Sequence, residues 1–263
     1  VGVIDIGSNS IRLVVYDRPE RGFLPLFNEK ALCGLGKGLT ETNRLSEDGV
    51  NAAFDSLARF AAVARGMEVA TLHVLATAAV RDAENGAAFV AEVEGRLGFD
   101  VRVLSGAEEA RLSALGVLCA MPQADGVAGD LGGGSMELVD LRVGSIGQQT
   151  TLPLGPLRLS ALDGPANRKK LVAHIDRHLA SVPWLSGLKG RPLYAVGGGW
   201  RSIAKAHMDM TGYPLHILHE YRLQTPALLD FLDRLQQIGK SEMKAINGVS
   251  KRRLETIPMA ALL

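Results

Sequence analysis

Two ten-residue stretches of this chain are variations of one pattern, and that repeat restricts the possible folds more than any other feature. Residues 5–14 (DIGSNSIRLV) recur in altered form as residues 130–139 (DLGGGSMELV). In each copy an acid ends an apolar run, a turn rich in Gly and Ser follows, and a second apolar run returns. Each copy therefore predicts a hairpin of buried strands. The pair predicts two related domains that face each other across a cleft.

The rest of the chain alternates short apolar runs with segments of helical periodicity, which is typical of an α/β protein. Further strands are expected at 71–76, 100–104, 148–154 and 192–196, and the second hairpin at 127–131 and 136–143. Helices are expected at about 46–66, 86–97, 105–120, 167–181 and 225–238, with one more ending near residue 210. For the helix at 225–238, Thr225 is the predicted N-cap and Pro226 the first helical residue.

Composition limits the class of protein. The chain has 263 residues, 47% of them hydrophobic, and a formal charge of +1, which argues against broad binding of nucleic acid. It has no run of 18 apolar residues, so a membrane span is not expected. Two cysteines form no disulfide framework, which favours a reduced, cytoplasmic protein. Pro, Asp and Gly within residues 121–126 are typical of a loop between domains, which suggests domains at 1–122 and 123–263. Because both ends lie within apolar patterns, we expect that both are trimmed and that a C-terminal segment is missing.

Three turns rich in Gly or Ser follow predicted strands, at 7–10, 132–135 and 197–199. Glycine lets backbone N–H groups approach phosphate oxygens where a Cβ would collide, and the third turn opens a helix, whose first amides favour an anion. Each turn taken singly also fits an ordinary tight turn. Three together, two of them preceded by Asp, favour phosphate binding.

The two hairpins differ in the residue that faces the acid. Asp5 is followed seven residues later by Arg12, whereas Asp130 is followed at the same spacing by Glu137. Two carboxylates are suited to a divalent metal ion, and a guanidinium is suited to bidentate contact with phosphate. The alternatives are turn caps for the acids and a surface salt bridge for Arg12.

Ser105 and Glu108 have the spacing of a capping box, so Glu108 is assigned a structural role. Glu109 then lies in the first turn of the helix, where stabilisation of its charge by the helix dipole would be enough to account for an acid at this position. Arg81 follows a strand-like run and would reach a phosphate from a strand end, or lie solvated. The six histidines form no metal or triad pattern, and the basic residues at 251–253 suggest a solvated face or a track for a polyanion.

Taken together, these segments resemble the exopolyphosphatase and guanosine pentaphosphate phosphohydrolase family, which belongs to the actin, Hsp70 and sugar-kinase superfamily. The matching blocks follow the family order: 5–12 (DIGSNSIR), 76–85 (ATAAVRDAEN), 105–111 (SGAEEAR), 130–138 (DLGGGSMEL), 152–155 (LPLG) and 196–199 (VGGG). The resemblance implies two actin-like (ribonuclease-H-like) domains and a homodimer. Met136 and Trp200 depart from the small hydroxyl residues that the family commonly has there.

The resemblance also implies roles for individual residues. Glu109 would be the catalytic base that deprotonates an attacking water, and Asp130 and Glu137 would hold Mg²⁺. It thereby overrides the structural interpretation of Glu109 that spacing alone favours. Phosphate oxygens would be bound by the three turns and two arginines, namely Ser8, Asn9, Ser10, Arg12, Arg81, Gly132, Gly133, Gly134, Ser135 and Gly198.

The leading hypothesis is therefore a Mg²⁺-dependent hydrolase of phosphoanhydride bonds that releases orthophosphate from the end of polyphosphate. The same chemistry on guanosine pentaphosphate is the nearest alternative. Two other classes stay open: an ATP-dependent kinase of a small molecule, and a phosphate or nucleotide sensor without catalysis. The expected partner is polyphosphate or a phosphorylated guanine nucleotide, with no membrane or nucleic acid.

Overall fold

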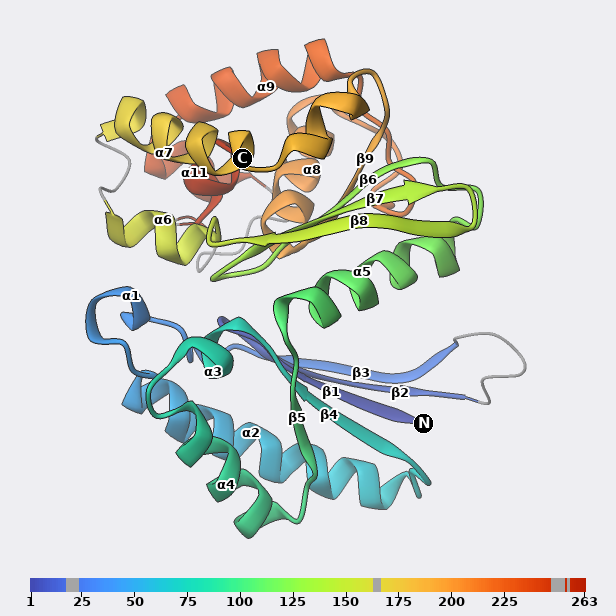
Figure 1. Cartoon of the computed structure of the whole chain (residues 1–263), viewed down its shortest axis with the longest axis vertical. Coiled ribbons are helices and arrows are strands. Elements are labelled where there is room, and N and C mark those ends of the chain that lie inside the picture. The colour runs from blue at the N-terminus through green and yellow to red at the C-terminus, as the bar shows by residue number, and fades with distance from the viewer. Residues whose placement is uncertain (18–23, 163–166, 247–253, 255) are drawn as a thin grey trace. The chain divides into compact units, whose positions relative to one another are not determined.

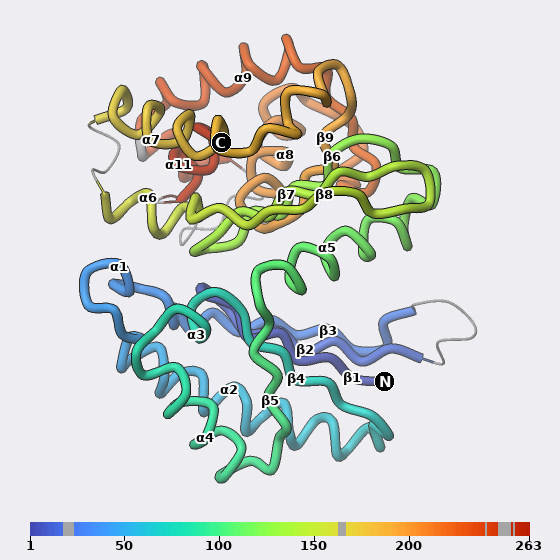
Figure 2. Tube along the Cα trace, viewed as in Figure 1, coloured from blue at the N-terminus to red at the C-terminus, as the bar shows by residue number. Residues whose placement is uncertain are grey.

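The chain forms two compact units, Val1–Glu109 and Ala110–Leu263, each with its own β-sheet and helices (Figures 1 and 2). A computed structural model describes residues 1–17, 24–162, 167–246, 254 and 256–263. The division between the units falls inside helix α5 (Gly106–Ala120), ahead of the punctuated segment 121–126. Strands and helices alternate in both units, which confirms the predicted α/β class.

The first unit contains a five-stranded sheet in the order β3-β2-β1-β4-β5. Its strands are β1 (Gly2–Ile6), β2 (Ile11–Tyr16), β3 (Pro25–Ala31), β4 (Leu72–Ala76) and β5 (Val101–Val103). β1 pairs antiparallel with β2 and parallel with β4. The helices of this unit are α1 (Leu39–Thr42), α2 (Glu47–Gly66), α3 (Ala78–Asp82), α4 (Gly86–Leu97) and the first turn of α5. Helices α2 and α4 lie side by side along one face of the sheet (Figure 1).

The second unit contains a four-stranded sheet in the order β8-β7-β6-β9. Its strands are β6 (Gly126–Leu131), β7 (Met136–Arg142), β8 (Ser145–Leu152) and β9 (Leu193–Gly197). The helices that follow are α6 (Pro156–Leu162), α7 (Arg168–Ala180), η3 (Pro183–Leu188), α8 (Gly198–Met210), α9 (Thr225–Gln237), α10 (Lys240–Ala245) and α11 (Ile257–Ala260). β6 pairs antiparallel with β7 and parallel with β9, so this sheet repeats the first with one strand fewer.

The repeated sequence forms the same hairpin in both units, as predicted. Asp5 is paired with Arg12 in the first sheet, and Asp130 is paired with Glu137 in the second. The turn closes identically, because the N–H of the first glycine donates to the carbonyl oxygen three residues on. That N–H···O distance is 3.0 Å in both the 7–10 and the 132–135 turn.

Local signals explain where several helices begin and end. The Ser46 hydroxyl accepts from the Gly49 N–H at the start of α2, and Gly98 ends α4 in the left-handed conformation. The capping box at the start of α5 is also present, since the Glu108 carboxylate accepts from the Ser105 N–H at 2.9 Å. The Ser105 N–H, the Ser105 hydroxyl and the Arg102 guanidinium all donate to this carboxylate, and these hydrogen bonds lower the pKa of Glu108 to about 2.

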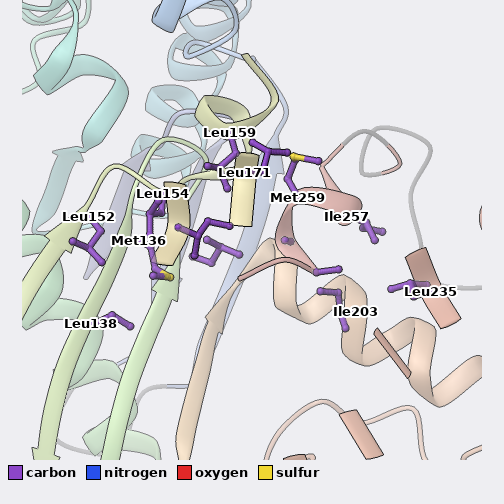
Figure 3. Close-up of a cluster of buried hydrophobic side chains, with 14 of the residues drawn as sticks. Met136, Leu138, Leu152, Leu154, Leu159, Leu171, Ile203, Leu235, Ile257 and Met259 are labelled. Carbon is purple, nitrogen blue, oxygen red and sulfur yellow. The ribbon is translucent and has the colours of Figure 1, made fainter. Parts of the chain in front are cut away.

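The second sheet is packed on both faces. Small residues of α5, including Ala110 and Ala114, cover one face, on which Ala128 and Val139 lie. The other face holds Leu131 and Leu138, and their cluster extends to α6, α7, α8, α9 and α11 (Figure 3). Burial on both faces explains why β6 and β7 are near-continuous apolar runs, interrupted by three acids, Asp130, Glu137 and Asp140.

Three local predictions were wrong. Arg81 does not follow a strand directly, because β4 ends at Ala76 and Arg81 lies in the short helix α3. Thr225 is the first residue of α9 and Gln224 is its N-cap. The predicted strand at 148–154 begins earlier, at Ser145, and ends at Leu152. Strand β3 and helix α6 were not predicted. The basic residues at 251–253 lie outside the described residues.

Candidate active site

Asp130 and Glu137 form an acid pair on neighbouring strands of the second sheet. Directly paired residues point to the same face, with Cβ atoms about 4.5–5.5 Å apart. Glu137 is only 1% exposed. The Ser113 hydroxyl, from helix α5, donates to Asp130 Oδ2 at 2.7 Å. The pair therefore lies between the second sheet and helix α5. Two negative charges held side by side there, largely away from water, are energetically unfavourable.

Burial raises the pKa of Asp130 above its ordinary value, while the Ser113 hydrogen bond and the charge of Arg201 act in the opposite direction. A bound cation would relieve both the desolvation and the repulsion between the two carboxylates. Mg²⁺ is commonly bound through one or two carboxylates, water and substrate phosphates. Within the described part of the chain, no group of three or more His, Cys, Asp or Glu residues is placed to hold a metal. The donor set thus fits Mg²⁺ better than a metal that requires a full protein cage.

The 132–135 turn is rigidly supported from behind. Gly133 O accepts from the Leu157 N–H at 3.0 Å, and Gly155 packs so closely that a Cβ there would lie 2.2 Å from Gly133 O. The Ser135 side chain is buried, and its hydroxyl has no hydrogen-bond partner among the described residues. A buried hydroxyl of this kind is available for a ligand.

The third glycine turn joins β9 directly to α8, as predicted. Gly197 has φ +103°, and a Cβ there would lie 2.4 Å from Leu131 O, so the close approach to β6 requires glycine. Gly198 then starts a helix of 13 residues, whose first amides point toward its N-terminal end. The Trp200 ring packs on Gly129 of β6.

The 7–10 turn of the first unit is supported in a similar way. Ser8 O accepts from the Gly36 N–H at 2.7 Å, and Asn9 O accepts from the Gly34 N–H at 3.1 Å. Arg12 is partly exposed, and its Nε donates to Asn28 Oδ1 at 2.9 Å. Asn28 therefore orients the guanidinium that the sequence assigned to phosphate.

Arg81 forms an ion pair with Glu109. Arg81 Nη1 donates to Glu109 Oε2 and to Leu104 O, both at 2.9 Å, and the two side chains are 22% and 16% exposed. Both residues belong to the first unit. The resemblance assigned Arg81 to the substrate, which stays a prediction. In this structure its guanidinium is hydrogen-bonded to the Glu109 carboxylate.

The geometry is matched by the comparisons with known proteins. A profile of the Ppx/GppA phosphatase family matches residues 14–263. The chain belongs to this family. Among its relatives, Exopolyphosphatase 1 of Mycobacterium tuberculosis is 29% identical over 279 residues, covering 100% of this chain and 79% of that protein. The homologue of the same name from Mycobacterium leprae is 27% identical and is covered to 80%.

Solved structures of Ppx/GppA proteins have the same fold. An exopolyphosphatase from Cytophaga hutchinsonii has a TM-score of 0.87 at 27% identity, with 99% of this chain and 87% of that chain covered. The Aquifex aeolicus family member has a TM-score of 0.79 at 24% identity, with the same coverage of both chains. These matches confirm the predicted pair of actin-like α/β domains. They also confirm the prediction of an exopolyphosphatase-like hydrolase that acts on phosphoanhydride bonds. None of the described helices is long and apolar enough to cross a membrane.

Sequence reasoning on this Ppx/GppA phosphatase missed several residues around the predicted site. Ser113 lies on the helix after Glu109, and only folding brings it to Asp130. Gly155 was noted as part of a family block, without the role that its contact with the 132–135 turn now shows. Asn28 lies on a strand that was not predicted. The sequence also gave no sign of the contact between His207 Nδ1 and the Tyr221 hydroxyl, which are 2.7 Å apart.

Proposed function

We propose that this phosphatase is a Mg²⁺-dependent exopolyphosphatase that releases orthophosphate from the end of inorganic polyphosphate. The observation that carries the proposal is the acid pair of the buried Glu137 and the partly buried Asp130, beside a glycine turn whose N–H groups suit a phosphate. The names of the curated relatives support polyphosphate as the substrate. A charge-dense anion of this kind needs cations and N–H donors more than a protein nucleophile.

In the proposed mechanism, a water molecule attacks the terminal phosphorus. Glu109 accepts the proton of that water, the new P–O bond forms, and the bridging P–O bond breaks so that the shortened chain leaves as an anion. Arg81 holds the Glu109 carboxylate in one orientation through the 2.9 Å ion pair. Asp130 and Glu137 would hold Mg²⁺, and the bound ion would supply positive charge to offset that of the phosphate.

The remaining site residues bind and orient the substrate in this proposal. In the second unit, the hydrogen-bond donors to phosphate are the backbone of the 132–135 turn, the Ser135 hydroxyl and Gly198. The 7–10 turn and the Arg12 guanidinium provide them in the first unit, with Asn28 as the residue that orients Arg12. Guanosine pentaphosphate as a substrate, a homodimer and a cytoplasmic location stay predictions.

The test is a pair of neighbouring substitutions. Glu109→Gln is expected to lower orthophosphate release by at least about 10²-fold, since general base catalysis contributes about 10²–10⁴, with polyphosphate still bound. Glu108→Gln is the matched control: it weakens the capping box and some stability but keeps turnover. Unchanged phosphate release by Glu109→Gln would contradict the assignment of the base.

A second measurement separates the substrates. Initial rates of orthophosphate release from long polyphosphate and from guanosine pentaphosphate are compared at equal Mg²⁺. A higher kcat/KM on polyphosphate is expected. A preference for the nucleotide would keep the mechanism and change the substrate, whereas activity unaffected by removal of Mg²⁺ would contradict the metal.

A further inference from the structure

The Thr151 hydroxyl is a buried polar group that the proposed mechanism does not use. Its oxygen is inaccessible to solvent and has no hydrogen-bond partner among the described residues. Leaving a buried hydroxyl unsatisfied is unfavourable, because it has lost its water and gained no replacement. Such a group in a folded protein calls for a specific explanation.

Its position in the sheet supplies one. Thr151 of β8 is paired with Glu137 of β7, and Glu137 is paired with Asp130 of β6. Paired residues point to the same face, so these three side chains form one row across three strands. We call Asp130, Glu137 and Thr151 the polar row. The only polar atoms in its three side chains are oxygens.

The neighbouring threonine shows that the placement is specific. Thr150 is paired with Leu138, whose side chain belongs to the apolar core on the other face of the sheet. Because successive strand residues alternate between faces, Thr150 points away from the polar row. The same residue type thus occurs once at the acid pair and once away from it.

The counterpart of this row in the first sheet has different chemistry. There Asp5 is paired with Arg12, and Arg12 is paired with Lys30 of β3. One acid and two bases suit an anion, whereas two acids and a hydroxyl suit a hydrated cation. A cation with octahedral oxygen ligation keeps several waters when only two carboxylates hold it, and those waters need hydrogen-bond partners.

We propose that Thr151 is a positioning residue for the cation of the acid pair, its hydroxyl binding the hydration shell of the ion beside Glu137. This inference rests on the proposed function, since it presupposes that Asp130 and Glu137 bind a divalent cation. It assigns a role in metal affinity to a strand that contributes none of the predicted site residues.

The experiment uses Mn²⁺ as the probe and the full chain without substrate. Binding is measured by the loss of the free Mn²⁺ paramagnetic resonance signal for the wild type, Thr151→Val, Thr151→Ser and the control Thr150→Val. Thr151→Val is expected to weaken Mn²⁺ binding at least about tenfold, as loss of a partner in the outer shell of a metal site does. Thr151→Ser and Thr150→Val are expected to bind like the wild type.

Thermal unfolding without metal distinguishes this role from a structural one. Because Val has the shape of Thr and no hydroxyl to desolvate, Thr151→Val is expected to be at least as stable as the wild type in metal-free buffer and to gain less from added Mn²⁺. Wild-type Mn²⁺ affinity in Thr151→Val would overturn the proposal for Thr151 alone. If Thr151→Val does not fold, the comparison of Thr151→Ser with Thr151→Ala decides by the same measure. Absence of Mn²⁺ binding by the wild type would overturn this proposal together with the metal site of the proposed function.

Discussion

The two copies of the hairpin share a backbone and differ in burial and charge. In the first copy Asp5 is exposed and its partner is Arg12, with Lys30 next in the row. In the second, Glu137 is buried beside Asp130. Under the proposed function, one scaffold would carry an anion site in one unit and a cation site in the other. The comparison teaches that the same duplicated turn can stand beside strand residues of opposite charge, which would suit it to different ions.

Removing the acid pair should have the largest effect. Glu137→Gln or Asp130→Asn is expected to abolish Mn²⁺ binding and to lower kcat about 10²–10³-fold, since a catalytic metal contributes several kcal/mol. Asp5→Asn is the matched substitution in the first hairpin and should leave Mn²⁺ affinity unchanged. Equal losses of Mn²⁺ binding in both hairpins would remove the distinction between them.

The supporting glycines provide the next comparison. A Cβ at Gly155 would lie 2.2 Å from Gly133 O, whereas one at Gly36 would lie 3.1 Å from Ser8 Cβ. Gly155→Ala is thus expected to lower the free energy of unfolding by about 3 kcal/mol and to raise KM, because the turn must move. Gly36→Ala should cost about 1 kcal/mol or less. Urea denaturation and initial rates measure both, and a larger effect at Gly36 would contradict the geometry.

Asp140 tests a difference at the other end of the same hairpin. It is a buried acid that accepts from Arg142 at 2.9 Å and from Arg191 at 2.8 Å, whereas the corresponding residue of the first copy is the buried Val15. Burial acts to raise the pKa of Asp140, but the two arginines outweigh it and hold that pKa below its ordinary value.

The sign of the pH dependence follows from that shift. Because the folded state binds the Asp140 proton less tightly than the unfolded state, this stabilisation is complete above the ordinary pKa and is lost as the pH falls toward the lowered one. Asp140→Asn is expected to lower the free energy of unfolding by about 2 kcal/mol at neutral pH, and by less in acid. Denaturant melts at several pH values measure this, and a pH-independent loss would argue against it.

Arg12 should give the smallest effect. Arg12→Gln is expected to raise KM for polyphosphate about tenfold, the loss of one charge-assisted contact at a partly exposed site, with kcat and Mn²⁺ affinity little changed. Asn28→Ala, which frees the guanidinium without removing it, should raise KM by less. A fall in Mn²⁺ affinity in Arg12→Gln would show that the two hairpins are not separate in function.

Some of the site was readable because its signals are local. The capping box at Ser105 and the turn glycines act within a few residues of themselves, so their spacing along the chain is enough to predict the structure. The short helix at Arg81 was missed because its apolar residues equally fit a strand, and only packing distinguishes the two. The pairing of Arg81 with Glu109 joins residues 28 apart and has no local signature.

The sequence by itself determined the duplication, the α/β class, the order of the turns and the exchange of Arg12 for Glu137, because strand alternation and turn chemistry are properties of short segments. Only the tertiary structure decided which groups meet. Burial of Glu137, the Ser113 hydrogen bond to Asp130, the contact of Gly155 with the 132–135 turn and the position of Thr151 all depend on strands and helices distant in the chain. Ion binding depends on desolvation and on neighbouring charges, and those arise only when such elements pack together.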